Sequence, residues 1–177
     1  SEDTKNVGEV TVTVTGKGNY SGKVQRKYHI TKAPLTVTTE GATRAYNGQP
    51  LTAPGTVTGF VEGENAELQV TGKQTDVGSS KNTYNIVWTE TTKADNYQVS
   101  DTVGTLTVTA QSIKDSEKIT VGTLSNVVYT GKKQEQEPAV TTQDGKTKLV
   151  KGTDYTLSYS EDTKNVGEVT VTVTGKG

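Results

Sequence analysis

Residues 1–18 read SEDTKNVGEVTVTVTGKG, and residues 160–177 repeat this stretch letter for letter. Within it, valine and threonine alternate from Val10 to Thr15. A period of two places the valines on one face of a β-strand and the threonines on the other. The stretch therefore predicts a half-buried strand that occurs twice in the chain.

The two copies also define a repeat, because Ser160 lies 159 residues after Ser1. Identical copies are typical of tandem arrays, in which each unit contacts mainly its neighbours. We therefore expect the chain to be a window cut from a longer array, with Ser1 and Gly177 inside the repeat rather than at natural ends. Such an array favours a stalk, a fibre or a multivalent binder over an enzyme.

Each period contains two related halves that share turn motifs. The corresponding motifs are Tyr46-Asn47-Gly48 with Tyr129-Thr130-Gly131, and Asp76-Val77-Gly78 with Asn165-Val166-Gly167. We interpret the halves as diverged relatives, A and B, that alternate along the array and have the size of small all-β domains. The expected segments are 1–33, the C-terminal part of a preceding A repeat; 34–110, a B repeat; and 111–177, the N-terminal part of the next A repeat.

Period-two alternation recurs at residues 35–38, 106–109 and 169–174, with turn-forming residues between these runs. The best helical candidate, residues 112–118, is short and has no apolar stripe. A single sheet would leave its apolar face in water, so two packed sheets are expected. The predicted fold is all-β, with tandem immunoglobulin-like antiparallel β-sandwich repeats; β-grasp-like repeats are the alternative. The expected core side chains are Tyr84, Ile86 and Trp88 in B, and Tyr155, Leu157 and Tyr159 in A.

The composition excludes several classes of function. Nineteen Lys and Arg residues balance twenty Asp and Glu residues, which argues against a nucleic-acid partner or an anionic membrane surface. The chain has no cysteine, which removes disulfides, thiolate nucleophiles and Cys-ligated metals and suits an exported chain. No apolar run approaches the length of a membrane-spanning helix, so no membrane insertion is expected within this window.

The motifs of both halves resemble known surface repeats. Residues 151–159, KGTDYTLSY, are followed by Asn165-Val166-Gly167 and the VTVTVTGKG strand, and the first copy of that strand continues into Asn19-Tyr20-Ser21-Gly22. This pattern resembles the bacterial immunoglobulin-like surface repeats of the GKGNYxG type, and the B half resembles the related YDG and mucus-binding-associated (MBG) repeats. The resemblance implies an extracellular protein at a bacterial cell surface, in which repeats hold a terminal domain away from the envelope.

The recurring motif residues are expected to have structural roles. Gly16 and Gly18 bracket a tight turn, where glycine supplies conformations that other residues resist. Tyr20 is expected to fold over the edge of the sandwich, as a tyrosine corner does. The full set of predicted structural residues is Gly16, Gly18, Asn19, Tyr20, Tyr46, Gly48, Gly78, Trp88, Tyr129, Gly131 and Gly167.

No catalytic, cofactor-binding or metal-binding residue is predicted. The only histidine, His29, lies in an alternating strand, without the base and orienting partner that nucleophilic catalysis requires. The acids have no calcium-loop spacing, although Asp115 and Glu117 on the expected connector leave a calcium site between domains open. A Lys–Asn isopeptide bond and O-glycans on the threonines also stay open.

The leading expectation is a structural repeat region that acts as a spacer without catalysis in a long bacterial cell-surface or extracellular stalk or filament. The expected partners are neighbouring copies arranged head to tail. If the chain continues covalently, the strands that complete each A repeat are the next residues; if it is a 177-residue polypeptide, residues 19–33 of one copy are expected to complete the open sheet of residues 111–177 of the next. The alternative is a multivalent adhesin module that binds mucin or other host or environmental glycans. Exposed rings of Tyr46, Phe60 and Tyr97 would carry that binding.

Overall fold

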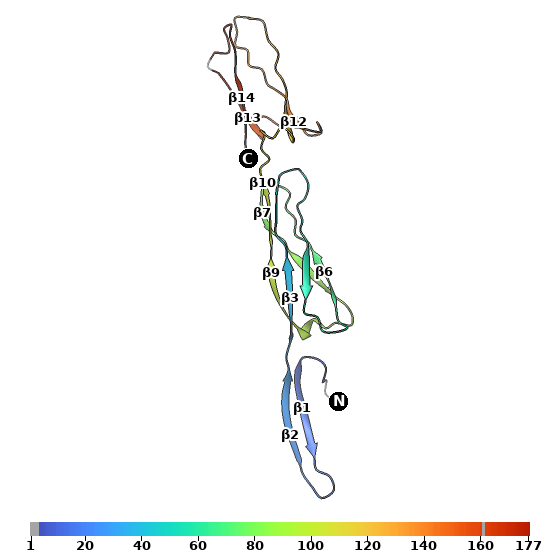
Figure 1. The fold of residues 1–177 in the computed structure, drawn as a ribbon. Coiled ribbons are helices and arrows are strands. Elements are labelled where there is room, and N and C mark those ends of the chain that lie inside the picture. The colour runs from blue at the N-terminus through green and yellow to red at the C-terminus, as the bar shows by residue number, and fades with distance from the viewer. Residues whose placement is uncertain (1–3, 161) are drawn as a thin grey trace. The chain divides into compact units, whose positions relative to one another are not determined.

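The computed structural model describes residues 4–160 and 162–177, and its regular elements are strands with one short 3₁₀ turn, η1 (Ala94–Asn96) (Figure 1). The predicted all-β class is confirmed. The strands are β1 (Gly8–Thr15), β2 (Lys23–Ile30), β3 (Ala33–Thr39), β4 (Ala42–Ala45), β5 (Gly55–Thr58), β6 (Ala66–Val70), β7 (Gly78–Lys81), β8 (Tyr84–Trp88), β9 (Tyr97–Val103), β10 (Thr105–Thr109), β11 (Ile119–Val121), β12 (Val140–Thr142), β13 (Tyr155–Tyr159) and β14 (Val171–Gly175).

The chain divides into two compact units. Unit 1 comprises Ser1–Arg44 and Gly48–Val108, and unit 2 comprises Ala45–Asn47 and Thr109–Gly177. The first copy of the repeated strand, β1, belongs to unit 1, and the second copy, β14, belongs to unit 2. The division of the chain into A and B repeats at residues 33 and 110 stays a prediction.

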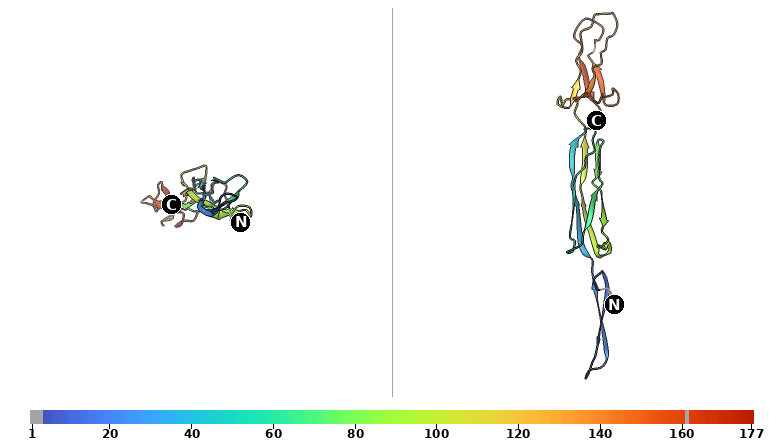
Figure 2. Two further views of the ribbon diagram at one scale, coloured as in Figure 1. Left: turned by 90° about the horizontal axis from the view of Figure 1, so that it is seen from below. Right: turned by 90° about the vertical axis from the view of Figure 1, so that its right-hand side faces the viewer.

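Strands β1 and β2 form an antiparallel hairpin, shown as two adjacent blue strands in Figure 2. The turn closes where the Gly16 amide donates to the Gly22 carbonyl at 2.9 Å, and Gly18 has a φ of 69°. The Tyr20 ring in this turn is 80% exposed, and its role as a tyrosine corner stays a prediction. A tyrosine corner needs a sheet to fold over, and the hairpin sheet has two strands among the described residues.

The rest of unit 1 is built from three small sheets, with strand orders β5-β3-β9, β4-β10-β7 and β6-β8. Strand β3 pairs antiparallel with β5 but parallel with β9. This parallel pair departs from the expected antiparallel sheets and requires the long connection that runs through β4 to β8. Leu35 and Val37 of β3 are fully buried, and Leu106 and Val108 of β10 pack with Leu51 in a core cluster.

A buried asparagine connects four segments of unit 1. The Asn82 side chain is fully buried, and its Nδ2 donates to the carbonyls of Glu40 at 2.9 Å and Ala53 at 3.0 Å. The Asn82 amide donates to the Gly104 carbonyl at 2.9 Å. A Cβ on Gly104 would lie 2.3 Å from the Glu40 carbonyl carbon, so only glycine allows the backbones to approach this closely.

Unit 2 pairs β11 with β12 and β13 with β14. Ile119, Val140 and Tyr155 form its buried core cluster, and Leu157 and Val173 pack against it. The predicted core role of Tyr155 is confirmed, while Leu157 and Tyr159 are half-buried. Residues 112–118 contain two short turns and no helix.

Candidate functional site

Three aromatic rings in unit 1 form a cluster. Phe60 meets Tyr97 edge to face at 5.5 Å and Trp88 edge to face at 6.2 Å, and Trp88 stacks on Tyr97 at 5.7 Å between ring centroids. These distances are typical of favourable aromatic pairs inside a core. Trp88 therefore packs within the unit, in keeping with the structural role that the sequence predicts for it.

The Tyr97 ring is only 3% exposed, and its polar end is also occupied. Its hydroxyl donates to Glu64 Oε2 at 2.8 Å and accepts from the Val61 amide at 3.2 Å. Loss of hydration raises the pKa of this hydroxyl above its ordinary value. Tyr97 thus anchors the end of β9 to the 61–64 turn and offers no face to a sugar.

The three predicted glycan-binding residues differ in their exposure. Tyr46 is 41% exposed and its amide donates to the Thr109 carbonyl at 2.8 Å, whereas Phe60 is half-buried and Tyr97 is buried. Sugar sites usually combine exposed aromatic faces with polar groups, and here one candidate ring in three is exposed. The structure does not provide the predicted set of exposed rings.

Most of the predicted structural glycines adopt a positive φ, whereas Gly16 does not. Gly48 and Gly131 have φ of 75° and 71°, in the left-handed region that glycine adopts without strain. Asn19 and Tyr20 lie in the exposed hairpin turn, Tyr129 is 54% exposed before Gly131, Gly78 begins β7, and Gly167 precedes β14. These residues serve the geometry of turns and strand ends.

The Asn165-Val166-Gly167 motif belongs to a closed turn organised by Asp162. Asp162 Oδ1 accepts from the amides of Lys164 at 2.8 Å and Asn165 at 2.9 Å, and Oδ2 accepts from Asn165 Nδ2 at 2.8 Å. These hydrogen bonds, with the Asn165 amide as the largest cause, lower the pKa of Asp162 to about 2. The Asn165-Val166-Gly167 motif was predicted from the sequence, whereas the role of Asp162 was not, although Asp-x-x-Asn is a recognisable turn signal.

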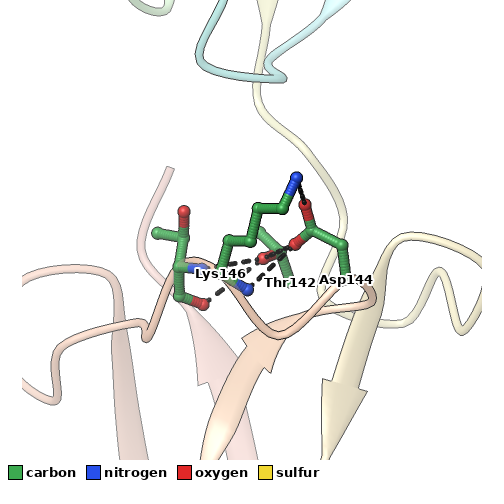
Figure 3. Close-up of polar contacts among 4 residues, drawn as sticks. Thr142, Asp144 and Lys146 are labelled. Carbon is green, nitrogen blue, oxygen red and sulfur yellow. Dashed lines mark hydrogen bonds and ion pairs between the residues drawn. The ribbon is translucent and has the colours of Figure 1, made fainter.

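A second acid, Asp144, has the same kind of role in the turn after β12 (Figure 3). Its Oδ1 accepts from the Thr142 hydroxyl at 2.6 Å and from the Lys146 amide at 3.1 Å, and Lys146 Nζ lies 3.8 Å from Oδ2. The hydrogen bond from Thr142 lowers the pKa of Asp144. The carboxylate closes its own turn.

The connector acids and the histidine also have local partners. Asp115 Oδ1 accepts from the Glu117 amide at 3.1 Å, and Oδ2 accepts from Gln111 Nε2 at 3.2 Å. His29 Nε2 lies 3.9 Å from Glu9 Oε2 on the exposed polar face of the hairpin. Among residues 4–160 and 162–177, no three acidic or histidine side chains converge as metal ligands, and no helix is long and apolar enough to cross a membrane.

The geometry so far defines a small all-β module, held together by an aromatic cluster and a buried asparagine. Residues 35–107 match the family model of the MBG domain (YGX type), which confirms the MBG-type resemblance over this stretch. Domains of this family are typical of extracellular surface proteins, and the match supports a surface repeat module. No curated protein and no solved structure matches the chain.

Proposed function

We propose that the chain is a repeat region of a long bacterial cell-surface or extracellular protein, in which it acts as a structural spacer without catalysis. The observation that carries this proposal is an identical 18-residue segment that returns after 159 residues, on either side of an MBG domain. Identical repeats add equal increments of length to an array. Their stability comes from contacts within each unit and with the neighbouring units. A spacer needs these properties and no active site.

The local contacts support the same function. Asn82, Asp144 and Asp162 direct their side chains to backbone groups of their own unit, so these side chains stabilise local turns and the core of unit 1. The connection between β2 and β3 consists of Thr31 and Lys32 alone. Pro34 follows within β3 and fixes its own φ, which further restricts the chain at this joint.

We favour the spacer over a glycan-binding adhesin because of the aromatic cluster. Phe60 and Tyr97 contact each other and Trp88, which leaves Tyr46 as the exposed ring among the three candidates. Avidity can amplify weak sites in an array, but each site still needs a surface that recognises the sugar.

The test compares the 177-residue chain with longer chains that contain one and two further 159-residue periods. Small-angle X-ray scattering measures the maximum dimension of each. A spacer predicts the same increment in that dimension for every added period. A dimension that stops growing because the repeats fold back on one another would contradict the proposal. Binding to mucin-type glycans that rises with copy number and disappears in Tyr46→Ala, but not in Tyr129→Ala, would favour the adhesin.

A further inference from the structure

The side chain of Asn96 joins two parts of unit 1 that are far apart in the sequence. Asn96 Oδ1 accepts from the Val7 amide at 3.0 Å, and Asn96 Nδ2 donates to Asn6 Oδ1 at 2.8 Å. Both hydrogen bonds are partly buried, so water competes with them less than it would at an open surface. The Val7 amide can only donate, which fixes the orientation of the Asn96 carboxamide. A reciprocal pair of hydrogen bonds therefore holds the turn before β1 to the start of β9.

This contact lies at the joint between the hairpin and the rest of unit 1. Gly8 of β1 pairs with Ile30, the last residue of β2, and Tyr97 of β9 pairs with Ala33, the first residue of β3. Two residues connect β2 to β3, and the Asn96 contact joins the residues directly before Gly8 and Tyr97. A two-residue connection alone could act as a hinge. A second contact beside it resists bending, because a bend that separates the strand ends must break its hydrogen bonds.

The backbone around Asn96 is well anchored. Asn96 ends the short turn η1, where its amide donates to the Lys93 carbonyl at 3.0 Å. The next residue, Tyr97, is buried, and its ring packs against Phe60 and Trp88. Asn96 is thus presented from the aromatic cluster of unit 1, which keeps its side chain in place for the turn.

The repeated turn offers the two groups that a carboxamide can bind. In the second copy, the hydrogen bonds from Asn165 to Asp162 use the backbone amide and the Nδ2 atom of Asn165. The Oδ1 atom of Asn165 and the backbone amide of Val166 take no part in these bonds. Their counterparts in the first copy are Asn6 Oδ1 and the Val7 amide, the two groups in the contact described above. The turn therefore presents one acceptor and one donor, which match the donor and the acceptor of a carboxamide.

We propose that Asn96 is a binding site for the Asn-Val-Gly turn of the preceding A repeat, and that this contact limits bending at each A-to-B joint of the array. Because residues 160–177 repeat residues 1–18, each period carries the same turn. Alanine at position 96 would offer neither a donor nor an acceptor to this turn. The inference rests on the proposed spacer function and specifies the residue that keeps the joint straight.

Spin labels can measure bending at this joint, because the natural chain has no cysteine to compete for the label. Cysteines replace Thr15, at the far end of β1, and Thr102, within β9, and both positions are exposed. Pulsed electron paramagnetic resonance on the 177-residue chain then gives the distribution of distances between the labels. We expect Asn96→Ala to broaden this distribution about twofold, because parts of a chain without a large shared interface move relative to each other by default.

Asn85→Ala is the matched control, because it makes the same chemical change at an exposed position of β8, outside this contact. Fluorescence of Trp88, the single tryptophan, checks that the aromatic cluster stays folded in each variant. Asn6→Ala removes the partner from the other side and should also broaden the distribution, which keeps the test valid where Asn96→Ala does not fold.

Two results would overturn the inference: an unchanged distribution in a folded Asn96→Ala or Asn6→Ala chain, or equal broadening in Asn85→Ala. The scattering experiment measures the length that each period adds, so equal increments would leave the spacer function standing where this contact fails. A narrow distribution in the natural chain together with arrays that fold back would instead contradict the spacer function alone.

Discussion

Strands β1 and β14 carry the same sequence but differ in length and burial. Strand β1 begins at Gly8, whereas β14 begins at Val171, the counterpart of Val12. Val14 is 62% exposed, whereas its counterpart Val173 is half-buried against the core of unit 2. Strand β1 spans the residues that pair with β2, and β14 spans the residues that pair with β13. Alternation predicts that a strand forms, but the neighbouring strand determines its limits and its burial.

The largest effect should come from removing the core behind β14. Tyr155→Ala deletes a side chain that is 5% exposed in the unit 2 cluster, and large-to-small changes of this kind cost about 3–5 kcal/mol. Hydrogen exchange followed by NMR should show lost amide protection in β14 and unchanged protection in β1. Tyr28→Ala, which removes a ring that is 47% exposed, serves as the control. If both copies lose protection together in Tyr155→Ala, their environments are not independent.

A smaller effect should distinguish two chemically identical substitutions. Val173→Ala removes methyl groups packed against the unit 2 cluster and should cost about 1–2 kcal/mol of unfolding free energy, whereas Val14→Ala should stay within about 0.5 kcal/mol. Urea titration of each variant measures its free energy of unfolding. The two positions share their flanking sequence, so a difference between the two losses reports a difference in packing. Equal losses at both positions would mean that the hairpin valines are as well packed as those of unit 2.

The smallest effect concerns pH and the turn before β14. The pKa of Asp162 is about 2 in the folded chain, lowered from its ordinary 3.8 by hydrogen bonds from Asn165 and Lys164. A lowered folded pKa contributes stability that is fully present above the unfolded pKa and is lost as pH falls from about 4 toward 2. Chemical denaturation across that range should show a weaker pH dependence for Asp162→Asn than for the natural chain. An unchanged pH dependence would show that the turn does not stabilise unit 2.

Local patterns in the sequence predicted much of the fold. Alternating residues located the strands at 35–38 and 106–109, because half-buried strands require a period of two. Tyr155 was correctly placed in a core for the same reason. The turn glycines at 48 and 131 were recognisable because few residues other than glycine adopt positive φ.

Features that depend on distant contacts could not be predicted in this way. The parallel pairing of β3 with β9 joins segments separated by six intervening elements, and nothing local encodes its direction. Asn82 lies between Lys81 and Thr83 in an unremarkable polar run, so its burial and its bonds to Glu40 and Ala53 have no signal in the sequence. The burial of a ring depends on which strands meet, and the local sequence does not show this, so Phe60 and Tyr97 were kept as candidates for sugar binding. The structure places both rings against Trp88.

The parallel pair of β3 and β9 has a mechanical consequence for a chain under tension. Seven residue pairs, from Ala33 with Tyr97 to Thr39 with Val103, join the two strands. The chain enters this pair at the N-terminal end of β3 and leaves it at the C-terminal end of β9, so its entry and exit lie at opposite ends of the ladder. A pulling force on the N-terminal end of β3 and the C-terminal end of β9 would load all of these pairs at once, in shear. Rupture then requires the whole ladder to slide, whereas an antiparallel hairpin pulled from its two ends opens one pair at a time.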